Sequence, residues 1–132
     1  MLSRHWLTGV VICAAILPTA AGAAVTEATF QLATTADLVD LCTAAPAEPM
    51  GTAAVNFCQG FAVGVYRVLD EENAAKRIGR LFCIPDTVKP SRNEAIAEFV
   101  QWAKASSDVM SQRPADGITT YLVQKYPCPR GK

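Results

Sequence analysis

The sequence predicts an all-α fold, a compact bundle of four to five helices stapled by two disulfides. Three observations support this fold class. Apolar residues recur at three- and four-residue steps, as on one face of a helix. Capping boxes mark two helix starts, and no segment alternates apolar and polar residues for long enough to form a strand. Four cysteines remain after an apparent export signal, and cysteines of small exported domains normally pair.

The first 23 residues have the form of a secretory signal peptide. Arg4 supplies a positive start, Leu7 to Leu17 is almost wholly apolar, and Ala21-Gly22-Ala23 matches a small-residue cleavage site. We therefore expect residues 1–23 to be removed and residues 24–132 to form one exported domain.

Two alternatives to cleavage fit the sequence less well. A membrane anchor needs about 20 apolar residues, whereas Pro18 ends the apolar run early. Lipid attachment at Cys13 is disfavoured because Ile12 is bulkier than the residue that usually precedes a lipidated cysteine.

Charge and histidine content exclude several functions. The chain has 12 basic and 12 acidic residues, so composition gives no reason to expect binding to nucleic acid or to an anionic membrane. The one histidine, His5, lies in the signal, which leaves no Ser–His or Cys–His nucleophile pair. Asp70, Glu71 and Glu72 are consecutive, so on a helix they would not face one another across a cleft. We expect no enzymatic activity and no cofactor.

The mature cysteines are Cys42, Cys58, Cys83 and Cys128. A four-thiolate zinc site is the alternative to two disulfides, but such sites usually present C-x-x-C pairs, which this chain lacks. Four cysteines allow three pairings, and sequence alone does not choose among them. The connection from Glu71 to Phe82 is long enough to return along the central helix, which favours Cys58 with Cys83 and Cys42 with Cys128.

The first predicted helix starts at a capping box. Asp37 is placed to accept from the amide of Thr34, and Leu38 and Leu41 follow on one face. Pro46 to Gly51 then form a loop.

A central helix is expected over Thr52–Asp70. One apolar stripe follows it: Ala54, Cys58, Phe61, Ala62, Val65 and Leu69. Gly60 and Gly64 lie at the flank of this stripe, although each glycine costs about 1 kcal/mol relative to alanine in a helix interior. We expect them to be packing residues, where another backbone approaches closely.

Beyond the central helix, Glu71–Arg80 reads as an exposed connection of mixed charge. A second capping box at Ser91 and Glu94 starts a third helix. Pro114 can occupy the first turn of a last helix, which ends at Pro127-Cys128-Pro129.

Four phrases resemble the Rap/Tai family of type VI secretion immunity proteins. They are Phe57-Cys58-Gln59-Gly60-Phe61-Ala62-Val63-Gly64, then Phe82-Cys83-Ile84-Pro85, a capped amphipathic helix, and Tyr126-Pro127-Cys128. The resemblance implies a periplasmic helical protein, often a homodimer, that neutralises a toxic effector, in the best-known branches a peptidoglycan amidase, by occluding its active site. It also implies disulfide roles for the four cysteines and packing roles for Gly60 and Gly64.

The resemblance transfers no binding surface, so we infer one from exposure. The apolar stripes of the three long helices are expected to pack on one another. Two regions remain: the Pro46–Gly51 loop, and Asp70–Arg80, where Lys76, Arg77 and Arg80 suit recognition of carboxylates on a protein partner. A small disulfide-stapled periplasmic stress chaperone, or a protein of other role on the same scaffold, is the alternative function.

Overall fold

Helices are the only regular secondary structure in the computed structural model, which describes residues 24–75 and 79–129. In chain order they are a 3-10 turn, η1 (Glu27–Gln31), and five α-helices: α1 (Thr35–Thr43), α2 (Gly51–Ala75), α3 (Arg92–Lys104), α4 (Ser107–Met110) and α5 (Pro114–Lys125). The predicted all-α class with two disulfides is therefore confirmed. The expected signal peptide, residues 1–23, lies outside the described residues.

The predicted helix starts are confirmed by side-chain caps. The amide of Thr34 donates to Asp37 Oδ2 at 2.8 Å, and Asp37 N donates back to Thr34 Oγ1 at 3.3 Å. Ser91 and Glu94 form the same reciprocal pair at α3. Pro114 occupies the first turn of α5, where its missing N–H costs nothing.

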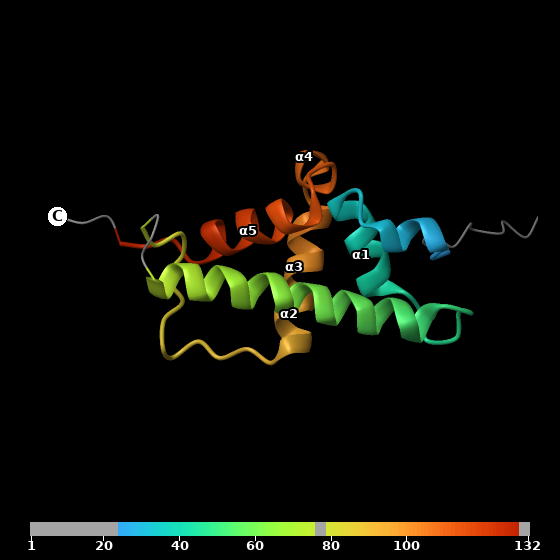
Figure 1. Cartoon of the computed structure of the whole chain (residues 1–132), viewed down its shortest axis with the longest axis horizontal. Helices are drawn as coiled ribbons and strands as arrows, with labels where there is room; N and C mark the ends of the chain where they lie inside the picture. The colour runs from blue at the N-terminus through green and yellow to red at the C-terminus, as the bar shows by residue number, and fades with distance from the viewer. Residues whose placement is uncertain (1–23, 76–78, 130–132) are drawn as a thin grey trace, which may run out of the picture.

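The central helix is longer than predicted. It runs from Gly51 to Ala75, so Glu71–Ala75 belongs to α2 and not to an exposed connection. Glutamate and alanine are strong helix formers, which explains why the helix continues through this polar stretch. α2 therefore spans about 38 Å, and Figure 1 shows it running along most of the molecule.

The core lies where α1, α3 and α5 meet α2. α5 lies along one side of α2, α3 crosses α2 steeply, and α1 packs near the N-terminal end of α2 (Figure 1). The most deeply buried apolar side chains, each at most 1% exposed, are Leu38, Val39, Leu41, Ala54, Cys58 and Ala103. The core is thus concentrated at the α1 end of the molecule.

Buried Thr35 fixes the start of α1 against the start of α5. Its amide donates to the Gln112 carbonyl at 2.7 Å, and its hydroxyl donates to the same carbonyl at 3.1 Å. A Cβ added at Gly117 on α5 would collide with this hydroxyl, so a glycine is needed for the close approach. These contacts join elements that lie far apart in the sequence.

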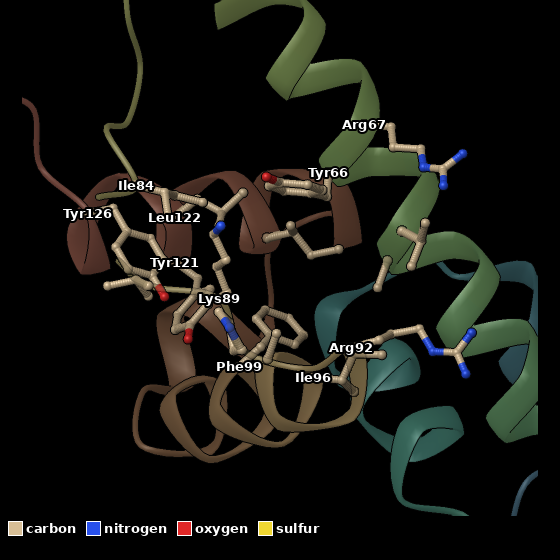
Figure 2. Close-up of a pocket in the computed structure, with 16 residues that line it drawn as sticks. Tyr66, Arg67, Ile84, Lys89, Arg92, Ile96, Phe99, Tyr121, Leu122 and Tyr126 are labelled. Atoms are coloured by element: carbon tan, nitrogen blue, oxygen red, sulfur yellow. The ribbon is translucent and has the colours of Figure 1, made fainter. Parts of the chain in front are cut away.

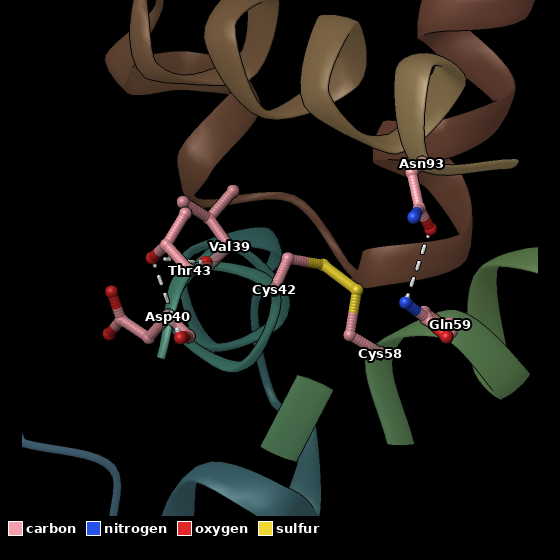
Figure 3. Close-up of a disulfide and its surroundings, with 7 residues drawn as sticks. All are labelled: Val39, Asp40, Cys42, Thr43, Cys58, Gln59 and Asn93. Atoms are coloured by element: carbon pink, nitrogen blue, oxygen red, sulfur yellow. Dashed lines mark hydrogen bonds between the residues drawn. A yellow bond between two sulfur atoms is a disulfide. The ribbon is translucent and has the colours of Figure 1, made fainter. Parts of the chain in front are cut away.

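The disulfides pair Cys42 with Cys58 and Cys83 with Cys128, at Cα–Cα distances of 5.2 and 4.8 Å. The predicted pairing of Cys58 with Cys83 and Cys42 with Cys128 is wrong. Figure 3 shows the first bridge joining the end of α1 to α2. On the loop-entropy account, whose mechanism is disputed, the two bridges contribute about 3 and about 4 kcal/mol to stability.

The pairing prediction failed because the chain does not return along α2. The Asn73 side chain accepts from the Leu81 amide at 2.8 Å and donates to the Phe82 carbonyl at 2.9 Å. Cys83 is thereby held near the C-terminal end of α2, whereas Cys58 lies about 22 Å further back along the helix. The nearest thiol is instead that of Cys128, since the Cys83 amide donates to the Tyr126 carbonyl at 2.8 Å.

Gly60 and Gly64 are exposed, and a Cβ added at either would meet nothing within 4 Å. The prediction that they are packing residues, with a backbone close by, is therefore wrong within the described chain. Tight glycine packing occurs instead at Gly51, where a Cβ would collide with the Ala45 carbonyl oxygen. Among the described helices, none is both long enough and apolar enough to span a membrane.

Candidate functional site

A groove opens between α2, α3 and α5, on the side covered by the segment that links α2 to α3. Its volume is about 470 Å³, within the range of sites that bind small molecules or side chains. Four elements line this α2–α3–α5 groove: Ala62, Val63, Tyr66 and Arg67 from α2; Ile84, Val88, Lys89 and Pro90 from the linking segment; Arg92, Ala95, Ile96 and Phe99 from α3; and Ile118, Tyr121, Leu122 and Tyr126 from α5 and its C-cap.

The linking segment forms one wall because it is tethered at its start and then kept out of helical conformation. Asn73 and the Cys83–Cys128 bridge fix its start against α2 and the end of α5. Pro85 and Pro90 then prevent helix formation until Ser91. The segment then runs apart from α2 before it enters α3 (Figure 1), and it borders the groove between the three helices.

Aromatic rings surround the space inside the groove. Figure 2 shows Tyr66, Phe99, Tyr121 and Tyr126 around it. Phe99 and Tyr121 make an edge-to-face contact, with ring centroids 5.8 Å apart and planes at 72°. Trp102 completes a cluster of three rings, with its centroid 5.4 Å from that of Tyr121 and 6.3 Å from that of Phe99. These contacts hold the floor rigid, which lowers the entropic cost of binding a partner there.

Tyr121 is oriented by an ion pair at the groove's edge. Its hydroxyl donates to Glu98 Oε2 at 3.1 Å, and Lys125 Nζ lies 3.1 Å from the same oxygen. Hydrogen bonds from Lys125 and Tyr121, with the charge of Lys125, lower the pKa of Glu98. Burial, and then the hydrogen bond to Glu98, raise the pKa of Tyr121, so its phenol stays neutral.

Tyr66 brings a second phenol to the groove from α2. It is 37% exposed, and its ring lies 6.4 Å from that of Phe82. Burial of the phenol, and then the nearby Asp70 carboxylate, raise its pKa. Tyr66 therefore remains a neutral hydrogen-bonding group on an accessible apolar wall.

Three cations lie among the lining residues: Arg67, Lys89 and Arg92. All three are exposed, and Figure 2 shows the two guanidinium groups on the same side of the groove. The arrangement can recognise a partner by apolar burial, by phenol hydrogen bonds and by positive charge. Within residues 24–75 and 79–129, no group of three or more His, Cys, Asp or Glu side chains is placed to hold a metal ion.

Of the three partner-binding residues predicted from the sequence, the structure describes only Arg80. Lys76 and Arg77 fall outside the described residues. Arg80 is exposed just after Gly79, whose φ is +82°, and it does not line the groove. Arg80, the one member of this predicted trio that the structure describes, is therefore not part of the aromatic groove.

Sequence reasoning missed the groove because it assumed that the three apolar stripes pack fully on one another. The stripes do contact the core, but Phe99, Ile118 and Leu122 also face the groove. One signal was present in the sequence. Arg92 occupies the first turn of a capped helix, where the macrodipole disfavours a cation.

Comparison with known proteins gives one match. No curated protein and no solved structure matches the chain. A family model described as Rap1a immunity proteins matches residues 34–128, from the cap of α1 to the last cysteine. This range covers most of the chain and includes all four elements of the groove. The chain therefore belongs to the Rap1a family of immunity proteins.

Proposed function

We propose that this protein protects the cell that makes it by binding a cell-wall amidase delivered by a type VI secretion system, and by occluding its active site in the periplasm. Membership of the Rap1a immunity family implies the immunity role. The observation that supports a binding mechanism is the open α2–α3–α5 groove, with its rigid aromatic floor and exposed cations. The protein itself acts as a non-enzymatic inhibitor.

Export by residues 1–23 is part of the proposal, because the target amidase works on peptidoglycan outside the inner membrane. Two intrachain disulfides support an oxidising compartment, since disulfides persist in the periplasm and are rare in the cytosol. If the gene beside this one encodes a secreted cell-wall hydrolase, that hydrolase is the candidate target.

The test is a protection assay in a bacterial host that expresses this neighbouring toxin with a periplasmic signal. We expect the full chain to restore growth and residues 24–132 alone, which lack the signal, to fail. If the full chain, confirmed in the periplasm, leaves the toxin lethal, the proposed function is wrong.

Occlusion is tested separately with purified components. The mature protein should abolish peptidoglycan cleavage by the toxin at a one-to-one ratio of chains. Tight binding that leaves cleavage intact would contradict active-site occlusion, although it would still allow protection by another route.

A homodimer belongs to the same proposal. The solvent-facing side of α2 exposes Phe57 (41%) and Val68 (62%) beside Gly60 and Gly64, whose surroundings are open. This side leaves room for α2 of a second copy. Light scattering on the purified protein should give twice the monomer mass, and Gly60→Leu should reduce it to the monomer mass. If light scattering gives the monomer mass for the wild-type protein even at high concentration, the proposed homodimer is wrong.

A further inference from the structure

The α2–α3–α5 groove is positive although the chain as a whole is balanced. The sequence has 12 basic and 12 acidic residues. Of the 16 residues that line the groove, three are cations and none is a carboxylate. The excess of positive charge is therefore a local property of this surface.

These three cations have no structural role that the described residues reveal. Two ion pairs between described residues join Arg113 to Asp116 and Lys125 to Glu98. Neither Arg67, Lys89 nor Arg92 has an ion-pair partner within residues 24–75 and 79–129. Arg92 also stands at a helix end that disfavours a cation. Exposed charges that are not held in an ion pair are available to a partner.

The apolar floor restricts what that partner can present. Ile96, Phe99 and Leu122 line the same groove as the cations, so a hydrophilic anion alone would leave these apolar side chains uncovered. An apolar side chain would bury the floor, while carboxylates beside it would reach the exposed arginines. Arginine recognises carboxylates through its planar, two-pronged donor geometry.

We propose that the groove binds an acidic segment of the effector in which a bulky apolar side chain enters the groove and neighbouring aspartates or glutamates meet Arg67, Lys89 and Arg92. This inference rests on the proposed function, because the segment belongs to the toxin that the protein neutralises. It is an alternative to the recognition surface of Lys76, Arg77 and Arg80 that the sequence predicts.

The test measures the affinity of purified variants for a catalytically inactive form of the toxin used in the protection assay. The groove variant carries Arg67→Glu, Lys89→Glu and Arg92→Glu. The matched control carries Lys76→Glu, Arg77→Glu and Arg80→Glu, which make the same change of charge on the surface predicted from sequence. We expect the groove variant to lose about 100-fold in affinity, since reversal turns three attractions into repulsions. The control should stay within about threefold.

Salt dependence and folding complete the comparison. Binding by the wild-type protein should weaken as ionic strength rises, because exposed charges are screened. The groove variant should lose this dependence while keeping the wild-type circular dichroism and melting temperature. An equal loss in both triple variants, or a groove variant that binds like wild type, would overturn the inference.

A photo-crosslinking residue at position 88 identifies the occupant directly. Val88 lines the groove and is 37% exposed, so a probe there is accessible. The crosslinked toxin peptide should contain an aromatic or aliphatic residue flanked by carboxylates. A basic or uncharged toxin peptide, or a crosslink to a second copy of this chain, would refute the inference and leave the immunity role intact. A toxin that fails to bind the wild-type protein would overturn both proposals.

Discussion

The N-terminal part of α2 and its middle differ in how completely the rest of the chain covers them. At the N-terminal end Gly51 is buried, Ala54 is fully buried, and Cys58 is 1% exposed and bonded to α1. Further along, Tyr66 is 37% exposed at the wall of an open groove. One helix therefore belongs to the core near its N-terminus and forms the wall of an open groove around its middle.

This difference shows how a small domain can leave an apolar groove open and still fold. The buried α1–α2 region and its bridge supply stability at one end. At the other end, Asn73 and the Cys83–Cys128 bridge hold the groove wall without filling the groove. Substitutions at the closed end should therefore affect stability, and substitutions in the groove should affect binding.

The largest expected effect contrasts two glycines of α2. In Gly51→Ala the new Cβ collides with the Ala45 carbonyl oxygen, and the backbone cannot move aside easily. We expect a loss of about 3 kcal/mol in the free energy of unfolding, typical of overpacking. Gly60→Ala should instead stabilise the monomer by about 0.5–1 kcal/mol, because its surroundings within one chain are open and alanine favours the helix.

Urea unfolding of both variants measures this contrast. Gly64→Ala is the matched control for the open region and should behave like Gly60→Ala, since nothing lies within 4 Å of its added Cβ either. If Gly60→Ala destabilises the monomer, another part of the chain must contact this side of α2, and the open description of this region would be wrong.

A second, smaller effect tests how the groove wall is held. Asn73→Ala removes both hydrogen bonds to the linking segment and leaves the Leu81 amide and the Phe82 carbonyl without their partner. An unsatisfied buried group costs about 1–3 kcal/mol, so we expect a loss of about 2 kcal/mol. Hydrogen exchange should show faster exchange of the Leu81 amide than in the wild-type protein.

Asn56→Ala is the control for this substitution, because Asn56 lies exposed on the same helix. Its effect should stay within about 0.5 kcal/mol. Equal stability of the two variants would mean that the disulfide alone fixes the segment and that the Asn73 bonds contribute nothing.

The sequence was informative where local chemistry determines structure. Capping boxes located the starts of α1 and α3, Pro114 located α5, and an even number of cysteines in an exported chain indicated two bridges. The pairing of those cysteines was not local, because it depends on where α2 ends and on the buried side chain of Asn73. Nothing in the helical periodicity distinguishes a polar residue that extends a helix from one that starts a loop.

The groove could not be read from the apolar pattern for a related reason. Periodicity identifies which side chains avoid water, but it does not say whether the facing helices meet. Periodicity predicts that Phe99 is buried, and the structure agrees. Phe99 nevertheless also forms part of the groove floor. The spacing between α2 and α5 depends on the linking segment, whose course is set by prolines and by long-range tethers.

The smallest expected effect concerns Glu98, which orients Tyr121 at the groove's edge. Its lowered pKa means that the charged carboxylate is favoured in the folded state. A carboxyl group with a lowered pKa stabilises the fold above its unfolded value, ordinarily 4.5, and loses this contribution as pH falls through the folded value. Glu98→Gln should therefore lower the melting temperature slightly at pH 7, and the difference from wild type should vanish in acid.

Melting curves of both proteins between pH 2 and pH 7 measure this difference. Other carboxylates titrate in the same range, including Glu94 one turn earlier, whose pKa is lowered by Ser91. Because both proteins retain those groups, the difference between the two melting temperatures isolates Glu98. A difference that grew below pH 4 would show that the carboxylate opposes folding, and Tyr121 would then be held by its ring contacts alone. A constant difference down to pH 2 would instead indicate that glutamine disturbs the packing around Tyr121.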